Sequence, residues 1–260
     1  MEIAGSVSVV TGASSGIGRA AAVMLAQRGA RVALVARNAG RLREAAGEAS
    51  RHSRAVAIEC DVSDEASVGK MAARVSSELG DPCILVNNAG FAVYGTVSEL
   101  AAAEIRAHME TNYFGAVHCT KAFLPRMVGH GSGKIVNVAS VAASIALPGI
   151  AAYCASKFAM LGFSEALRAE LRGTGVGVTV VSPIAVRTPF FDHPSFAGMR
   201  RYSPVSLSAE TVARAIMRAV DSPRGEIVVP GAARAAIWAR QTFPHAFNAL
   251  VAAAFGRGRA

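Results

Sequence analysis

The sequence has few cysteines, few aromatic residues and few charged residues for its 260 positions. Its four cysteines form no CxxC pair and have no histidine at ligand spacing, which argues against both a metal site and a disulfide framework. Free thiols fit a reducing compartment, and because no secretory signal is visible, we expect a cytoplasmic location. The apolar stretch at residues 246–255 is far shorter than the roughly 20 residues of a transmembrane helix.

Charged residues make up only 17% of the chain and hydrophobic residues 52%, which excludes a disordered protein and allows a large buried core. The length favours one domain over residues 1–260. The net charge of +9 could reflect nucleic acid, anionic lipid or an anionic cofactor. The arginines are spread along the chain without a basic helix, a lysine cluster or an aromatic platform, so we expect no nucleic-acid partner.

Short β-branched runs alternate with longer alanine-rich stretches whose apolar residues recur about every 3.6 positions. Strands that are apolar on both faces and separated by helices indicate a parallel sheet covered on both sides. The sequence therefore predicts an α/β fold: a doubly wound, Rossmann-type parallel sheet of about seven strands with helices on both faces. The expected strands are Val7–Val10, Arg31–Ala36, Ala55–Glu59, Ile84–Val86, Lys134–Val138, Val176–Val181 and Glu226–Val229.

Two stretches stand outside this alternation. Residues 183–208 lack clear periodicity, which indicates a substrate loop that closes over an apolar pocket with Phe190, Phe191, Phe196, Met199 and Tyr202. Residues 231–260 form a helical extension that is interrupted at Pro244. The extension could pack on the domain or on a second subunit, or it could lie in a membrane surface with its flanking arginines, Arg234, Arg240, Arg257 and Arg259.

A glycine-rich turn, Thr11-Gly12-Ala13-Ser14-Ser15-Gly16-Ile17-Gly18-Arg19, follows the first strand. Its glycines let backbone N–H groups approach a pyrophosphate, and the next helix directs its positive N-terminus at that charge. The strand before the turn, the helix after it and the second strand supply the context for dinucleotide binding. The expected cofactor contacts are Gly12, Ser14, Ser15, Gly16, Ile17 and Gly18.

The second strand ends in Ala36-Arg37-Asn38 and lacks the acidic residue that usually binds the ribose hydroxyls of NAD. An arginine at this position can pair with the 2′-phosphate of NADP. We therefore expect NADP(H) to be preferred over NAD(H), with Arg37, and also Arg19, directed at cofactor phosphate. The alternative is a surface arginine that only begins the next helix.

Tyr153 and Lys157 are four residues apart, which places them on one side of a helix. A phenol with its usual pKa near 10 is a poor acid or base at neutral pH, and a nearby ammonium lowers that pKa. Ser140 lies at the end of the fifth expected strand, and doubly wound sheets bind their ligands at strand carboxyl ends. These three residues are therefore candidate catalytic groups.

In these motifs the sequence resembles the short-chain dehydrogenase/reductase family, from the TGxxxGxG turn at residues 11–18 to the last strand near Val229. The resemblance implies a catalytic tetrad of Asn112, Ser140, Tyr153 and Lys157. It implies further cofactor contacts from Tyr153, Lys157, Asp61, Val62, Asn88, Ala89, Gly90, Pro183, Val186 and Thr188. Ile184 departs from the pattern, because the family usually has a glycine there to line the nicotinamide pocket.

The resemblance also implies that Tyr153 exchanges a proton with the substrate oxygen while a hydride passes between NADP(H) and carbon. A protein that senses the dinucleotide without turnover is the alternative, although it would not need Ser140, Tyr153 and Lys157 as a set. Family members commonly form dimers or tetramers, so we expect a homodimer or homotetramer. A lipophilic carbonyl compound or alcohol is expected from the apolar residues near the tetrad, Val141, Ala142, Ala143, Ile145, Leu147, Phe91, Val93 and Tyr94.

Overall fold

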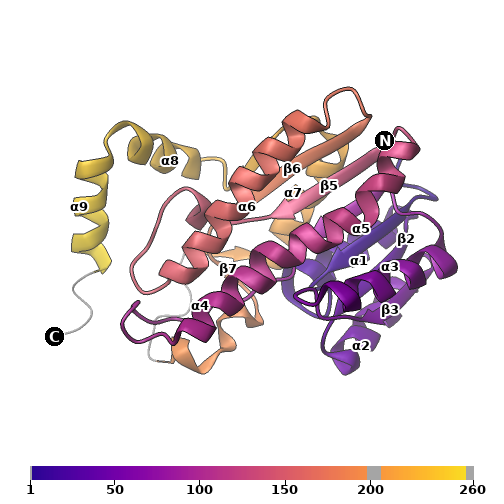
Figure 1. The fold of residues 1–260 in the computed structure, drawn as a ribbon, viewed down its shortest axis with the longest axis horizontal. Helices are drawn as coiled ribbons and strands as arrows, with labels where there is room; N and C mark the ends of the chain where they lie inside the picture. Colours follow the sequence, from indigo (N-terminus) through magenta and orange to yellow (C-terminus); the bar gives the residue numbers. More distant parts are fainter. Residues whose placement is uncertain (1, 198–205, 256–260) are drawn as a thin grey trace.

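The computed structural model describes residues 2–197 and 206–255, and seven parallel strands form its main sheet (Figure 1). The strand order β3-β2-β1-β4-β5-β6-β9 confirms the predicted doubly wound α/β fold. Every expected strand is present, and several extend by a residue or two. Their bounds are β1 Val7–Thr11, β2 Arg31–Ala36, β3 Ala55–Glu59, β4 Ile84–Asn87, β5 Gly133–Val138, β6 Val176–Pro183 and β9 Glu226–Val229.

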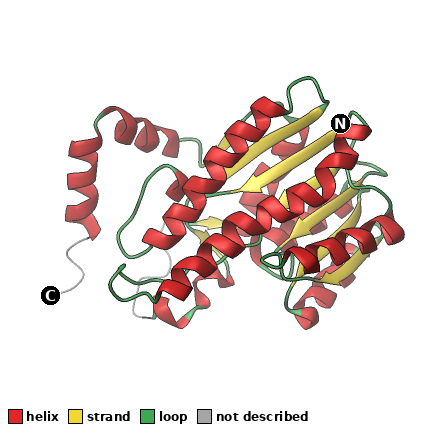
Figure 2. Cartoon of the chain, viewed as in Figure 1, coloured by secondary structure: helices red, strands yellow, loops and turns green. Residues whose placement is uncertain are grey.

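Helices cover both faces of the sheet, as strands that are buried on both sides require (Figure 2). Alternation along β1 shows the two layers, because Val10 packs in one core cluster while Val7 and Val9 pack in the other. One face carries α1 Gly16–Gln27, α2 Ala39–Ala49 and α7 Ala209–Asp221, and the opposite face carries α3 Glu65–Leu79, α5 Gly115–Gly129 and α6 Ala151–Glu170.

A π-helical turn at Glu110–Phe114 joins α4, Ala102–Met109, to α5. Such a turn inserts an extra residue into a helix and is frequent at functional sites. Here it carries Asn112, which is completely buried.

The turn between β1 and α1 is attached to the end of β4. The Thr11 hydroxyl oxygen accepts hydrogen bonds from the backbone N–H groups of Asn88 and Ala89, both at 3.0 Å. The Asn88 side-chain amide donates to the Thr11 carbonyl at 3.0 Å. Gly12 has a φ of +65°, and a Cβ there would lie 2.9 Å from the Ala89 Cα. Only glycine lets these two strand ends approach so closely.

Residues 183–208 contain a small second sheet that the sequence did not predict. It pairs β7, Val186–Arg187, with β8, Leu207–Ser208, in parallel. Short 3₁₀ turns at Pro189–Asp192 and Pro194–Phe196 lie between them. Two-residue strands are too short to produce a periodic pattern, so their pairing was not visible in the sequence.

The C-terminal extension forms two helices, α8 Ala233–Thr242 and α9 Pro244–Phe255, as the break at Pro244 predicted. Figure 1 shows that α9 stands away from the sheet. Ile237 on α8 is buried against Ile145 and Val228. Across the described parts of the chain, no helix is both long and apolar enough to cross a membrane.

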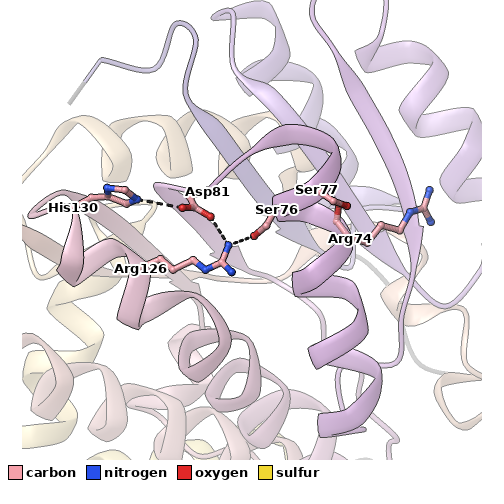
Figure 3. A network of polar contacts seen from close by, with 6 residues as sticks. All are labelled: Arg74, Ser76, Ser77, Asp81, Arg126 and His130. Atoms are coloured by element: carbon pink, nitrogen blue, oxygen red, sulfur yellow. Dashed lines mark hydrogen bonds and ion pairs between the residues drawn. The ribbon is translucent and has the colours of Figure 1, made fainter.

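A surface network ties the end of α3 to the end of α5 (Figure 3). The Arg126 guanidinium donates to the Asp81 carboxylate and to the Ser76 hydroxyl, and His130 Nε2 lies 3.2 Å from the other Asp81 oxygen. Hydrogen bonds from His130 and Arg126 hold the pKa of Asp81 below its usual value. This cluster lies where the chain enters β4 and β5, so Arg126 connects helices at the end of the sheet opposite the strand carboxyl ends.

The surroundings of Gly18 in α1 and Gly69 in α3 predict opposite effects of glycine-to-alanine substitution on stability. A Cβ on Gly18 would lie 2.4 Å from the Gly12 carbonyl oxygen, so Gly18→Ala is expected to lower the free energy of unfolding by about 1–3 kcal/mol. Gly69 lies inside α3 with open space around it, so Gly69→Ala is expected to raise that free energy by about 0.5–1 kcal/mol. Urea unfolding followed by circular dichroism measures both changes in the free energy of unfolding. If the two substitutions changed it equally and in the same direction, the packing described for Gly18 and Gly69 would be contradicted.

Candidate functional site

A cleft of about 470 Å³ opens at the carboxyl ends of β1, β2 and β4. The strand order reverses between β1 and β4, which is where doubly wound sheets bind dinucleotides. The predicted cofactor residues that line the cleft are Gly12, Ser14, Ser15, Arg37, Asp61, Val62, Ala89 and Gly90. The lining residues that were not predicted as cofactor contacts are Val35, Ala36, Asn38, Cys60, Phe91 and Thr111. Phe91 was expected to border the substrate, and most of the others adjoin predicted cofactor residues.

Other predicted cofactor residues support the glycine turn from behind or from the side. The Asn88 amide also approaches the Gly12 carbonyl, at 3.4 Å. Thr188 lies against the start of α1, because a Cβ on Gly16 would be 2.9 Å from the Thr188 methyl carbon. Pro183 and Val186 are buried, and Ile17 is half-buried on α1. The segment 183–188 therefore closes on the turn that the sequence assigned to phosphate binding.

Ile184, which departs from the family pattern, fits the backbone without strain. Its N–H donates to the Val229 carbonyl at 2.9 Å, which extends the β6–β9 pairing. None of the described residues other than glycine has a positive φ, so position 184 does not need the conformational freedom of glycine. Ile184 consequently leaves the path of the chain unchanged.

Arg37 extends from the end of β2 with 66% of its side chain exposed, and its guanidinium lies 3.8 Å from the Asp61 carboxylate. Burial alone would raise the pKa of Asp61, but hydrogen bonds from Ser63 and the charge of Arg37 hold it below its usual value. Arg19, which was also expected to face cofactor phosphate, pairs with Glu48 of α2 at 2.8 Å. The structure thus leaves Arg37 as the arginine that lines the cleft.

The four residues of the predicted tetrad converge from three elements. Lys157 and Tyr153 share α6, with the Lys157 ammonium 5.7 Å from the centre of the Tyr153 ring. The Lys157 ammonium donates to the carbonyl of Val138, at the end of β5, at 2.9 Å. Ser140 follows that strand and hydrogen-bonds the Tyr153 hydroxyl. This brings a hydroxyl, a phenol and an ammonium together beside the cleft.

Asn112 completes the group through its amide. Its Oδ1 accepts the Phe91 N–H at 2.9 Å, and its Nδ2 donates to the Phe91 carbonyl at 3.0 Å and to the Ser156 hydroxyl at 2.9 Å. A Cβ on Gly90 would lie 3.0 Å from Asn112 Oδ1 and 3.6 Å from the Lys157 ammonium. Gly90 therefore keeps the segment after β4 in contact with both residues.

Burial controls the protonation of the two titratable residues. It raises the pKa of Tyr153 to about 12, an effect that the hydrogen bond with Ser140 only partly opposes. It lowers the pKa of Lys157 to about 8. The expected lowering of the pKa of Tyr153 by Lys157 stays a prediction, while burial gives the phenol a raised pKa.

Aromatic rings form a continuous series from Tyr153 into the substrate loop. The Phe190 ring meets the Tyr153 ring edge-on at 5.5 Å, Phe191 meets Phe190 at 5.2 Å, and Phe196 meets Phe191 at 5.3 Å. Tyr94 closes the series, 6.0 Å from Phe196. These contacts place Phe190 against Tyr153 and link the other rings of the series to it.

Polar contacts anchor the same loop. The Tyr94 N–H donates to the Ser195 hydroxyl at 2.9 Å, and that hydroxyl also lies 2.8 Å from His193 Nδ1. His193 is exposed and caps the turn that follows it. Met199 and Tyr202, which were expected to belong to the lid, lie outside the described residues.

His108 is a buried residue of the site for which the sequence gave no signal. It is fully buried, its Nε2 accepts the Val93 N–H at 2.9 Å, and its Nδ1 lies 2.7 Å from the Glu104 carbonyl. Its ring stacks on Phe91 with centroids 4.7 Å apart. A single histidine on a helix has no motif partner, so only the tertiary structure connects it with the cleft.

Among the described residues, the cysteines and acidic side chains form no metal centre. All four cysteines are free thiols. Over residues 2–197 and 206–255, no three His, Cys, Asp or Glu side chains gather closely enough to hold a metal ion.

Comparison with known proteins gives consistent results. The family model described as short chain dehydrogenase matches residues 6–195. The chain is 34% identical over 260 residues to dehydrogenase/reductase SDR family member 7B of Danio rerio, with 95% of this chain and 84% of that protein covered. It is 38% identical over 229 residues to D-threitol dehydrogenase of Mycolicibacterium smegmatis, with 84% and 87% covered.

Solved structures agree with these sequence relatives. A short chain dehydrogenase/reductase from Burkholderia phymatum in complex with NAD has a TM-score of 0.86 at 28% identity and covers 93% of this chain and 95% of its own. A metagenomic short-chain oxidoreductase in complex with NADP has a TM-score of 0.75 at 30% identity, with 88% and 98% covered. The similarity therefore extends over both the cleft and the tetrad.

The burial of Lys157 predicts a pH-dependent stability. Below about pH 8 the folded chain carries this charge in its interior, whereas the unfolded chain keeps the usual pKa of 10.5 and binds the proton more tightly. The free energy of unfolding should therefore rise between pH 8 and 10.5. Relative to Lys157→Met, the wild type should gain about 3 kcal/mol over that interval.

Urea unfolding at several pH values measures this difference, and groups common to both proteins cancel. The matched control is Lys70→Met, which removes an exposed lysine of α3 and should leave the difference constant. A constant difference for Lys157→Met as well would show that Lys157 is not destabilised by burial.

Proposed function

The chain belongs to the short-chain dehydrogenase/reductase family, and on this premise we propose that it interconverts a lipophilic carbonyl compound and its alcohol with NADP(H) as cofactor and Tyr153 as acid and base. It is an oxidoreductase of CH–OH groups that uses a nicotinamide dinucleotide. The observation that carries the finer proposal is the convergence of Asn112, Ser140, Tyr153 and Lys157 beside the cleft.

The residues of the cleft fit a dinucleotide. Gly12 and the N-terminus of α1 would hold the pyrophosphate, since the turn presents backbone N–H groups where no side chain intervenes. Asp61 and Val62 would border the adenine ring, and Lys157 would bind the nicotinamide ribose. When bound, the dinucleotide supplies a hydride to the substrate carbon or accepts one from it.

Proton transfer falls to Tyr153. Because its pKa lies near 12, the phenol is protonated at neutral pH and can donate its proton to the oxygen of a carbonyl substrate. Ser140 would hold that oxygen by a second hydrogen bond. Lys157 and Asn112 would connect the phenol to solvent protons. This arrangement supports proton exchange between Tyr153 and the substrate oxygen.

Apolar surroundings support a lipophilic substrate. The rings of Phe190, Phe191 and Phe196 extend outward from Tyr153, and Ala142, Ala143 and Ile145 are buried in the segment that follows Ser140. Apolar walls of this kind favour an apolar ligand with few polar groups. The relative named D-threitol dehydrogenase suggests a small polyol as a second candidate substrate, so a substrate panel must contain both classes.

The same proposal covers assembly and location. We propose a homodimer or homotetramer, supported by exposed aromatic side chains at Phe114 and Phe158. The four free thiols support a cytoplasmic location. Residues 1–260 would act as one cofactor-binding domain, with residues 183–208 as its substrate loop.

Substitution of Tyr153 by phenylalanine tests the catalytic proposal. Tyr153→Phe removes the proton donor but keeps the ring contact with Phe190, so turnover should fall about 10²–10⁴-fold while NADPH affinity stays within about twofold. NADPH oxidation over a panel of aliphatic ketones, aldehydes and polyols gives the rate, and fluorescence titration gives the affinity. Unchanged turnover would refute the role of Tyr153, and a wild type without turnover on any substrate would favour the dinucleotide sensor.

Removal of Arg37 tests the cofactor preference. Arg37→Ala should lower kcat/KM for NADPH by about 10–100-fold, because a charge-assisted pair with the 2′-phosphate is lost, and should hardly change it for NADH. Arg43→Ala on the exposed side of α2 is the matched control. A wild type that prefers NADH would overturn the NADP(H) proposal, as would an equal loss with both cofactors in Arg37→Ala.

A further inference from the structure

The C-terminal arm, which we define as α8 and α9, leaves large apolar side chains uncovered. Trp238 is 62% exposed, Phe243 58% and Leu250 69%. The rings of Trp238 and Phe243 meet edge-on at 6.2 Å, so the two residues form one aromatic surface at the junction of the helices. Figure 1 shows the arm extending outward from the sheet.

The inner side of the arm is attached to the substrate side of the cleft. Ile237 is buried, and together with Phe247 it packs in a cluster that includes Val141, Ile145 and Leu147. These last residues belong to the segment that follows Ser140. The arm is therefore held against a wall of the substrate site by one set of side chains and exposes a different set.

The charge of the arm is of one sign. Residues 231–260 contain no aspartate or glutamate, and Arg234 and Arg240 lie on α8. Arg257 and Arg259 lie outside the described residues. The net charge of the chain is +9. A symmetric contact between the arms of two copies would bring like-charged arginines together, whereas an anionic surface attracts them.

We propose that the arm binds the surface of an anionic membrane. Trp238, Phe243 and Leu250 enter the interfacial layer, where burial of aromatic and aliphatic side chains is favourable. Arg240 contacts the headgroup phosphates. Because the inner side of the arm packs on residues 141–147, the bound protein holds its substrate site beside the lipid. Access to substrate from the lipid is an advantage only if the substrate is lipophilic, as proposed above. Membrane binding itself does not depend on that proposal.

Cosedimentation of the full chain with lipid vesicles tests the proposal. Wild type should bind vesicles of phosphatidylcholine with about 30% phosphatidylserine and bind pure phosphatidylcholine much more weakly. The double variant Trp238→Ser/Leu250→Ser should lose about tenfold or more in partition into the anionic vesicles. Arg240→Gln should weaken binding to anionic vesicles only. Val128→Ser, which removes a partly exposed apolar residue at the far end of α5, is the matched control and should bind like wild type.

Light scattering measures the oligomeric state and turnover measures activity, so together they distinguish membrane binding from a contact between subunits at this surface. Each variant should keep the oligomeric state of the wild type and its turnover on a soluble carbonyl compound. No binding of wild type to anionic vesicles, or equal binding by the double variant, would overturn the proposal. An oligomer that dissociates in the double variant would identify the arm as a subunit contact instead. Vesicle binding is measured without cofactor or substrate, so its failure is separate from a failure of the proposed function.

Discussion

The close contact between the glycine turn and the end of β4 is the constraint from which the site follows. Thr11 and Asn88 join the two strand ends by hydrogen bonds, and Gly12 and Gly18 leave the space that this contact needs. The contact directs the N-terminus of α1 toward the cleft. It also places Gly90, three residues beyond β4, against Asn112 and Lys157. One junction of two parallel strands thus positions both the cofactor cleft and the tetrad.

Two residues of the tetrad are built into the interior, and their polar groups are satisfied there. Asn112 and Lys157 are both buried, and each has hydrogen-bond partners on the backbone. Such partners are required because an unpaired polar group in the core costs several kcal/mol. Burial also lowers the pKa of the Lys157 ammonium and raises that of the Tyr153 phenol. Catalytic pKa values and stability are consequently set by the same burial.

Sequence reasoning predicted the sheet and most of the cofactor cleft because those features are local. Strand periodicity and the glycine spacing report on the backbone over a few residues, and the strand ends then determine which loops meet. It did not predict the pairing of Arg19 with Glu48, the β7–β8 sheet or the stacking of His108 on Phe91. Each of these joins residues that are far apart in the chain or depends on side-chain burial. The same limit explains why the effect of burial on the pKa of Tyr153 was not predicted, since burial is a property of the whole fold.

The cofactor side and the substrate side of the site are built from different groups, and this difference bears on which residues determine substrate specificity. The cofactor side consists largely of backbone groups at strand ends, and its close contacts at Gly12 and Gly18 leave no room for added side chains. The substrate side consists of side chains from segments outside the main sheet. There the Gly95 N–H donates to the Gly149 carbonyl at 2.8 Å, and the Tyr94 ring occupies the space that a side chain on residue 149 would fill. Phe190 and the C-terminal arm complete this side from two further directions. Substitutions that change the substrate should therefore concentrate in these peripheral segments, while the sheet and its glycine turn preserve the chemistry.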